Sequence, residues 1–256
     1  MCLILLGNQT SEEYPFVLVA NRDEFLNRPT LYACRWRDKP AIYGGRDLKS
    51  GGTWLGLSNS GRLAAVTNYR DPANLMDEAQ SRGTLVTGFL ESNMTPTEYL
   101  HQISESARAY NGFNLIVWET GRLGYLSNRG NRGPVLIEPG IHGLSNDLMN
   151  TPWPKVSKGK ESLRGLLSDG ANDPSSFLAM MHDLDQASDD DLPDTGVGLE
   201  LERALSSMFI RTPGYGTRSS TVVLVRHDGE LIFAERNFGD DGRATNTSTY
   251  RTVISI

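Results

Sequence analysis

The beginning of the chain decides the fold: it reads MCLILLGNQT at residues 1–10 and FVLVANRDE at residues 16–24. Two apolar runs on either side of a polar turn predict a β-hairpin made of residues 2–6 and 16–20. The first run has no basic leader and is too short to span a bilayer. We therefore expect a buried strand here, with no secretion signal and no integral membrane segment.

The rest of the chain alternates between strand-rich and helix-rich regions. Residues 155–208 are predicted to be mostly helical around an acidic loop at 188–194, and Thr95 with Pro96 fits a helix start. Strands, then helices, then strands indicate packed α/β layers. No repeat or linker breaks this order, so we predict one domain over residues 1–256. Further strands are expected at 53–57, 63–67, 114–118, 124–126, 221–225, 231–235 and 250–256, and further helices at 78–92 and 97–110.

The composition limits the classes of partner. The formal net charge is -6 and the pI is about 5.3, whereas nucleic acids and anionic membranes attract clustered Lys and Arg. We expect a small-molecule ligand and no nucleic acid, and the sequence gives no indication of the oligomeric state. Cys2 and Cys34 are too few for a disulfide framework and lack nearby soft ligands for a metal. A reducing compartment follows, and we predict a cytoplasmic protein without a metal site.

Cys2 is the first candidate for chemistry. If Met1 were removed, Cys2 would carry both a thiol and a free α-amine, whose pKa of about 8 lets its neutral form accept the thiol proton. Such a residue needs no histidine to act as a nucleophile. The alternative interpretation is a small hydrophobic side chain on a buried strand, which is the usual role of a lone cysteine.

Four strongly polar residues, Asn21-Arg22-Asp23-Glu24, end the second apolar run. A cluster of this kind is costly to bury unpaired, so it indicates either an active site or a surface group of salt bridges. In an active site, Arg22 would lower the pKa of a neighbouring thiol. Asp23 or Glu24 would hold the α-amine by hydrogen bonding.

Other polar residues next to predicted strands or turns are candidates for binding a developing negative charge. Asn68, Asn114 and Asn146 could each donate a side-chain amide hydrogen bond to an oxyanion, although asparagine is more often a turn former. Arg218 directly precedes a predicted apolar strand. It could balance a carboxylate or bind an anionic group.

Seven motifs follow one another along the chain: MCLI at 1–4, ANRDEF at 20–25, GGTWLG at 51–56, TNY at 67–69, NGFNL at 111–115, GLSN at 143–146 with TPW at 151–153, and PGYGTR at 213–218. Together they resemble the transport and Golgi organisation protein 2 family, also called the NRDE family. The resemblance runs from end to end and implies a single NRDE-family domain. That family is similar in turn to the cysteine N-terminal-nucleophile hydrolases of the penicillin V acylase and bile salt hydrolase type.

This resemblance implies an α+β fold, a four-layer αββα sandwich of the N-terminal-nucleophile hydrolase type. Arg22 and Asp23 are adjacent and would point to opposite faces of a strand, so Glu24 is an alternative acidic partner on the face of Arg22. The implied site residues are Cys2 as nucleophile, Arg22 and Asp23 as the arginine and acidic residue beside it, Asn68 and Asn146 as oxyanion-binding or amine-binding asparagines, and Arg218 as the late arginine.

Three functions remain open at this point. The first is an enzyme that cleaves or transfers acyl groups at amide or thioester bonds through Cys2, with no required cofactor. The second, implied by the family resemblance, is a non-catalytic carrier of haem as cargo, or handling of lipids or acyl-CoA, in the same cleft. The third is recognition of a protein partner. The four histidines show no paired spacing for haem, so we expect a weak haem site with Cys2 or Cys34 as candidate thiol ligands.

Overall fold

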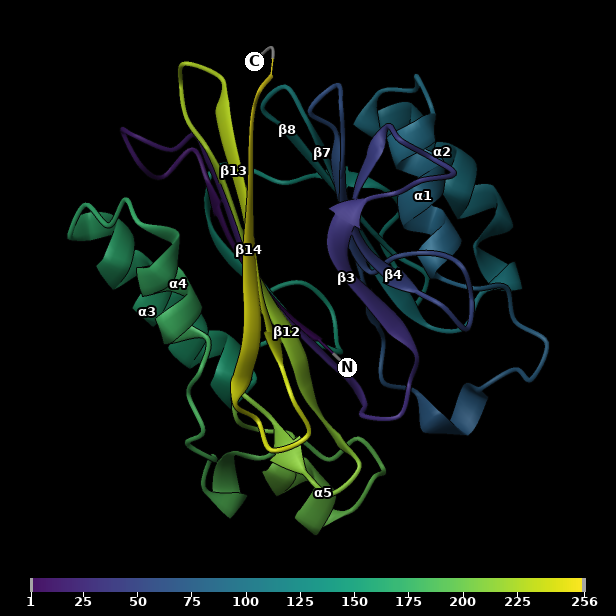
Figure 1. The fold of residues 1–256 in the computed structure, drawn as a ribbon. Coiled ribbons are helices and arrows are strands. Elements are labelled where there is room, and N and C mark those ends of the chain that lie inside the picture. The colour runs from purple at the N-terminus through teal and green to yellow at the C-terminus, as the bar shows by residue number, and fades with distance from the viewer. Residues whose placement is uncertain (1, 255–256) are drawn as a thin grey trace. The chain divides into compact units, whose positions relative to one another are not determined.

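The computed structural model describes residues 2–254. The chain divides into two compact units, and Figure 1 shows their strands and helices. Unit 1 consists of Met1–Asn27 and Pro139–Thr252, and unit 2 consists of Arg28–Glu138 and Val253–Ile256. Each unit has a β-sheet and helices of its own. The single domain over residues 1–256 stays a prediction.

The sheet of unit 1 joins the two ends of the sequence. Its strand order is β10-β1-β2-β12-β13-β14, with β11 paired to β12, and the predicted hairpin is formed by β1 and β2. The pairs of β1 with β10 and of β2 with β12 are also antiparallel. Its strands are β1 (Cys2–Asn8), β2 (Phe16–Phe25), β10 (Gly140–Leu144), β11 (Arg211–Thr212), β12 (Tyr215–Val225), β13 (Glu230–Phe238) and β14 (Ala244–Val253).

Helices cover one face of this sheet. Odd-numbered apolar residues of β1 and β2, such as Leu3 and Val19, pack against Val156 and Leu163 of α3 and Phe177 of α4 in one buried cluster. The even-numbered residues therefore project to the opposite face, because side chains alternate along a strand. The helices of unit 1 are α3 (Pro154–Ser168), α4 (Pro174–Met180) and α5 (Leu199–Ala204), with a 3₁₀ turn η3 (Asp189–Asp191).

Unit 2 repeats the combination of one sheet and one helical layer. Its core joins Leu115 and Val117 of β7 to Phe89 of α1 and Leu100 of α2. The strand order is β3-β4-β5-β6-β7-β8-β9. Its elements are β3 (Thr30–Arg35), β4 (Ile42–Asp47), β5 (Leu55–Ser58), β6 (Leu63–Asn68), η1 (Pro72–Asn74), α1 (Gly83–Glu91), α2 (Pro96–Ser106), η2 (Ala107–Ala109), β7 (Phe113–Glu119), β8 (Arg122–Ser127) and β9 (Val135–Leu136).

The helix start predicted at Thr95 and Pro96 is confirmed. The Thr95 side chain accepts from the backbone N–H of Glu98, and Glu98 bonds back to the Thr95 N–H, which is a complete capping box. The prediction for residues 155–208 was too helical, because α3, α4 and α5 are separated by irregular chain. The first predicted helix was too long, since α1 starts at Gly83 rather than at residue 78.

Two strands of unit 1 are longer than predicted. β2 does not end at residue 20 but continues through the polar motif to Phe25, and β12 begins at Tyr215 rather than at residue 221. Both extensions pair with each other, since Tyr215 lies opposite Phe25. Polar residues can occupy these positions because they have partners on the neighbouring strands. The last part of the strand predicted at 250–256 lies outside the described residues.

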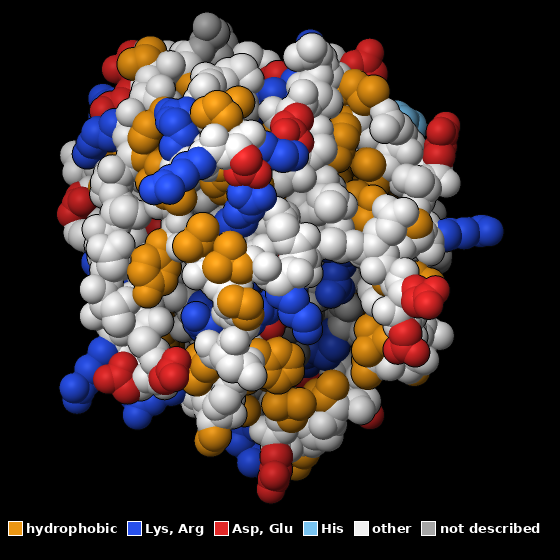
Figure 2. Space-filling model, turned by 45° about the vertical axis from the view of Figure 1, so that its right-hand side comes forward, with side chains coloured by type: hydrophobic (Ala, Val, Ile, Leu, Met, Phe, Trp, Pro, Cys, Tyr) orange, Lys and Arg blue, Asp and Glu red, His pale blue; other side chains and the backbone are white. Residues whose placement is uncertain are grey.

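The two units share one architecture. Each has a sheet with helices on one face, so the predicted layered α+β fold is confirmed. Within residues 2–254, no helix is long and apolar enough to cross a membrane. On the face drawn in Figure 2, basic, acidic and hydrophobic side chains are intermixed over most of the surface.

Candidate active site

Cys2 and Arg22 lie opposite each other on neighbouring strands. They are partners in the antiparallel register of β1 and β2. Side chains directly opposite in such a pair project to the same face, with Cβ atoms about 4.5–5.5 Å apart. The next pair, Leu3 and Asn21, projects to the face that the helices of unit 1 cover. Cys2 and Arg22 therefore share the other face.

Ser145 and Asn146 follow β10, which pairs with the other side of β1. The register joins Ile4 to Leu144, and continuing it by two residues brings Asn146 opposite Cys2. The Ser145 hydroxyl donates to the backbone carbonyl of Cys2 at 3.1 Å and lies 3.3 Å from Asn146 Oδ1. Both side chains are buried. The end of β10 thus holds an asparagine amide beside the candidate nucleophile.

Arg22 is a buried cation with an acidic neighbour on its own strand. Its side chain is 5 % exposed, and its Nη2 lies 4.0 Å from Oε2 of Glu24. Residues two apart on a strand project to the same face, so Glu24 accompanies Arg22 while Asp23 points the other way. The alternation expected from the sequence is observed, and Glu24 forms an ion pair with Arg22.

The Asp23 carboxylate lies on the helix-covered face. Thr217 Oγ1 donates to its Oδ1 at 2.7 Å, and the Tyr215 hydroxyl donates to its backbone carbonyl at 3.0 Å. Burial raises the pKa of Asp23, whereas the positive charges of Lys155 and of the N-terminus act to lower it. Lys155 is itself buried at the start of α3. The carboxyl group of Asp23 and the ammonium group of Lys155 are therefore both buried inside unit 1.

Burial also raises the pKa of the Cys2 thiol. The charges of the N-terminus and of Arg22, together with the backbone N–H of Asp23, favour the thiolate, and the Asp23 carboxylate disfavours it. Burial prevails, so the thiol is protonated near neutral pH. To act as a nucleophile it needs a base, and no histidine lies among the groups that perturb it.

Arg218 occupies a β-bulge. The pairing of β12 with β2 shifts between Thr217, which lies opposite Asp23, and Ser219, which lies opposite Arg22. A bulge inserts one extra residue and re-aims the side chains around it. The prediction that Arg218 directly precedes a strand was wrong, because Arg218 lies inside β12 and the bulge interrupts the apolar pattern there.

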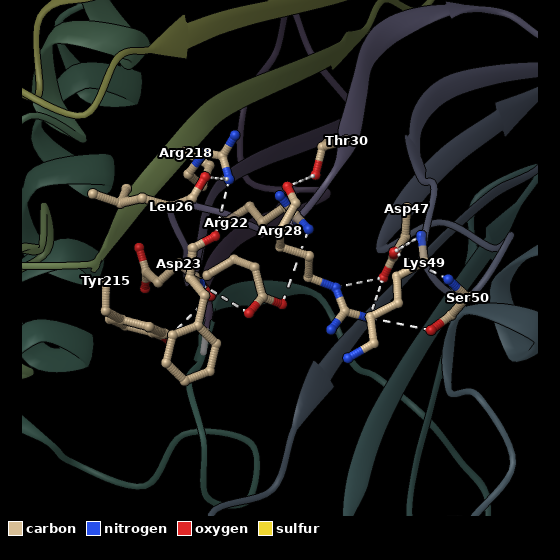
Figure 3. A network of polar contacts seen from close by, with 12 residues as sticks. Arg22, Asp23, Leu26, Arg28, Thr30, Asp47, Lys49, Ser50, Tyr215 and Arg218 are labelled. Carbon is tan, nitrogen blue, oxygen red and sulfur yellow. Dashed lines mark hydrogen bonds and ion pairs between the residues drawn. The ribbon is translucent and has the colours of Figure 1, made fainter.

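The bulge directs Arg218 toward the end of β2. Its Nη1 donates to the backbone carbonyls of Phe25 at 2.9 Å and Leu26 at 2.8 Å. Figure 3 shows Arg218 beside Leu26, to which a dashed line joins it. Arg218 therefore ties β12 to the segment that follows the NRDE motif.

Two polar residues that the sequence did not single out continue the row across the sheet. Ser219 lies opposite Arg22, and Asn237 of β13 lies opposite Ser219. Both are buried, and within residues 2–254 neither Ser219 Oγ nor Asn237 Nδ2 has a hydrogen-bond partner. In the row Cys2–Arg22–Ser219–Asn237, the Ser219 hydroxyl and the Asn237 amide are therefore hydrogen-bond donors without an acceptor among the described residues. Its signal in the sequence is weak, because serine and asparagine on alternating strands normally face water.

Lys155 was also missed. It follows the TPW motif and the helix-initiating Pro154, where a lysine is usually solvated. Lys155 is only 2 % exposed, and its buried positive charge acts to lower the pKa of Asp23. A single sequence carries no signal for this, because the partner lies more than a hundred positions away.

Asn21, the first residue of the NRDE motif, serves the fold. Its Nδ2 donates to the backbone carbonyls of Met181 at 2.9 Å and Met208 at 2.8 Å. Its Oδ1 accepts from the Ser220 hydroxyl at 2.6 Å. This side chain joins the sheet to two irregular segments of unit 1.

Two other candidate asparagines lie in unit 2. Asn114 donates to Thr67 Oγ1 at 3.1 Å and accepts from the Tyr125 hydroxyl at 2.8 Å, so both ends of its amide are engaged and its role as an oxyanion donor is not supported. Asn68 is the last residue of β6 and is half-buried. Its part in the site stays a prediction.

The described part of the chain contains no cluster of three His, Cys, Asp or Glu side chains arranged for a metal ion. Both cysteines are free thiols, Cys2 half-buried and Cys34 exposed.

Solved structures with similar folds include a Caenorhabditis elegans N-acylethanolamine-hydrolyzing acid amidase ortholog. It has a TM-score of 0.48 and 11% identity, and the match covers 87% of this chain and 92% of that chain. A mutant conjugated bile acid hydrolase from Clostridium perfringens also has a TM-score of 0.48, with 10% identity over 100% of this chain and 99% of that chain.

Sequence relatives match over nearly their whole length. The chain is 39% identical to a Transport and Golgi organization protein 2 homolog of Bos taurus, over 98% of each chain, and 39% identical to that of Homo sapiens, over 99% of each. The Transport and Golgi organization protein 2 of Drosophila melanogaster is 28% identical, over 92% of this chain and 91% of its own. A family model described as Transport and Golgi organisation 2 matches residues 1–240. The chain therefore belongs to the Transport and Golgi organisation 2 family.

Proposed function

We propose that the chain cleaves or transfers acyl groups at amide or thioester bonds, with Cys2 as the nucleophile once Met1 has been removed. The observation that carries the proposal is the row formed by Cys2 of β1, Arg22 of β2 and Asn146, which lies two residues beyond the end of β10. An activated nucleophile, a hydrogen-bond donor for negative charge and a fixed cation are the parts that acyl transfer requires.

In the proposed reaction, Sγ of Cys2 attacks the carbonyl carbon of the acyl group. The thiol proton passes to the α-amine of the same residue. The side-chain amide of Asn146 donates to the oxyanion of the tetrahedral intermediate. When the intermediate collapses, the leaving amine or thiol takes the proton from the α-ammonium group, and a thioester remains on Cys2. Water or another acceptor then releases the acyl group and regenerates the thiol.

Charged residues stabilise the thiolate of Cys2 and the α-ammonium group in this scheme. Arg22 favours the thiolate of Cys2 by its positive charge. Asp23 is a buried carboxylate next to Arg22 in the sequence, and we assign it to holding the α-ammonium group that forms on Cys2 during attack. Arg218 is a positioning residue in this scheme, because it fixes the backbone carbonyls at the end of β2.

A largely apolar cavity lies at the end of β2. A cavity of about 650 Å³ in unit 1 is bordered by Phe25, Leu26 and Pro213. The Phe25 ring is 59% exposed and meets Tyr215 edge-on at 5.3 Å between centroids. Phe25 is three residues beyond Arg22, about 10 Å along the strand, so its side chain projects to the face of Asp23, whereas Arg22 and Cys2 share the other face. An acyl chain or a flat apolar group is the kind of ligand that such a wall binds.

The test compares turnover of acyl amides and acyl thioesters by the protein lacking Met1 and by its Cys2→Ser variant. We expect turnover to fall by about 10³-fold or more, because a hydroxyl is far less acidic than a thiol, while ligand affinity persists. Cys34→Ser is the matched control and should keep full activity, since Cys34 is exposed and belongs to unit 2. Turnover that survives in Cys2→Ser would refute Cys2 as the nucleophile.

Carriage of haem, or handling of lipids or acyl-CoA without turnover, is the second candidate. The exposed Phe25 ring and the cavity beside it favour a flat, apolar ligand as well as an acyl chain. The same experiment separates the two functions. A carrier would turn over none of the acyl substrates, and Cys2→Ser would change its ligand affinity only if the sulfur contacts the ligand.

A further inference from the structure

A second cavity of unit 1 is bordered by three arginines. It has a volume of about 660 Å³ and lies among α4, β11, β13 and the turn that leads into β14. Arg211 comes from β11, Arg236 from β13 and Arg243 from the turn, so three separate segments contribute an arginine to the border of one cavity. His182, just after α4, completes this arginine cavity.

Two of the three arginines lack an acidic partner. Within residues 2–254, neither Arg211 nor Arg236 forms an ion pair; Arg236 Nε donates to Thr247 Oγ1 at 3.4 Å. Arg243 lies 3.6 Å from Asp241, which also borders the cavity. The cavity therefore carries an excess of positive charge in a protein whose formal net charge is -6. Like charges gathered in this way repel one another, and a bound anion would relieve the repulsion.

The side of the cavity at His182 is rigid and partly aromatic. The His182 ring lies 4.0 Å from Phe209 and 5.6 Å from Phe238, and these two rings meet edge-on at 4.8 Å. Both phenylalanines are buried. Burial, together with the positive charge of Arg236, lowers the pKa of His182.

The Arg211 side chain is held in place by the turn. A Cβ atom on Gly242 would lie 3.1 Å from Cδ of Arg211, so the stem of the arginine packs on the glycine backbone. Gly242 also has a positive φ of 75°, a conformation that favours glycine. The turn thereby keeps the guanidinium of Arg211 at the cavity.

We propose that the arginine cavity binds the phosphoryl group of a small, soluble phosphorylated molecule. Arginine presents its N–H donors in a planar fork that matches phosphate oxygens, and two forks from different strands hold a doubly charged anion better than a singly charged one. The concave shape and the volume favour a small molecule over a flat macromolecular surface. This site is independent of Cys2 and of the proposed acyl chemistry.

Calorimetric titration with pyrophosphate tests the site. We expect saturable binding that Arg211→Gln and Arg236→Gln each weaken about tenfold or more, as for loss of a charge-assisted hydrogen-bond donor. Arg251→Gln is the matched control: it removes the same charge from β14 but breaks only an exposed ion pair with Glu230, so affinity should change by less than about twofold. Absence of saturable binding, or equal weakening in Arg251→Gln, would overturn the proposal.

Further measurements test whether the arginine fork and the surroundings of His182 contact the anion, and whether the anion is a soluble molecule or a lipid headgroup. Arg236→Lys keeps the charge but loses the fork, so it should also bind pyrophosphate more weakly than the wild type. The ring resonances of His182 should shift on binding while those of His101, which lies in unit 2, stay in place. Association with phosphatidate vesicles in the absence of any binding to soluble pyrophosphate would contradict a soluble ligand. Thermal unfolding of each variant verifies that the substitutions leave the fold intact.

Discussion

Replacing Asn21 with alanine removes three hydrogen bonds from the interior of unit 1. The carbonyls of Met181 and Met208 lose their amide donor, and the Ser220 hydroxyl loses its acceptor. Asn21 is fully buried, so water cannot simply take the place of its amide. Each buried polar group left unsatisfied costs about 1–3 kcal/mol, partly offset by relaxation, and we expect a total loss of about 3–4 kcal/mol.

Urea denaturation of wild type and Asn21→Ala measures this loss as a difference in the free energy of unfolding. For a protein of this size it corresponds to a fall in Tm on the order of 10 °C. Asn246→Ala, an exposed change on β14, is the control and should stay within about 0.5 kcal/mol of the wild type. If Asn21→Ala lost less than about 1 kcal/mol, or abolished turnover at unchanged stability, a scaffold role for the first residue of the motif would be refuted.

Three further outcomes follow from the site. In the chain that retains Met1, iodoacetamide should modify the exposed Cys34 before Cys2, because burial raises the pKa of the Cys2 thiol. Peptide mapping over time gives the order of modification, and faster modification of Cys2 would contradict the prediction. The pKa of Asp23 is raised in the folded protein, so the folded state holds the proton more tightly than the unfolded state does. The stability of the wild type relative to Asp23→Asn should therefore be greatest at low pH and fall from about pH 4 upward through the folded pKa. Urea unfolding at several pH values measures this difference, and a difference that does not depend on pH would contradict the prediction. A Soret titration should give a haem complex that a stronger apo-acceptor strips rapidly, whereas no spectral change would remove haem as cargo.

The N-terminal hairpin could be predicted because its signal is local. Apolar residues fill β1 and the first half of β2, and a polar turn separates them. The end of β2 could not be predicted in the same way. Asn21 and Asp23 have partners near residues 181, 208 and 217, and such distant contacts decide that a polar stretch is buried strand rather than surface loop.

The candidate site was predictable in part from residue types and motif order. Cys2, Arg22 and Asn146 were singled out from the sequence, and β10, β1 and β2 bring these three together. The bulge at Arg218 depends on the register of β12 against β2, which no single strand encodes. β10 itself was missed, because GIHGL is short, half-exposed and has no clear alternation. The burial of Lys155 likewise depends on the partner it meets only in the fold.

The most direct test of the central claim is to trap the acyl group. The protein lacking Met1 is incubated briefly with an acyl thioester, quenched in acid, digested and analysed by mass spectrometry. If Cys2 is the nucleophile, the N-terminal peptide gains the mass of the acyl group on Cys2, the peptide containing Cys34 stays unmodified, and Cys2→Ala gives neither adduct nor turnover. Turnover by the wild type with no adduct on Cys2, together with undiminished turnover by Cys2→Ala, would contradict the proposed mechanism.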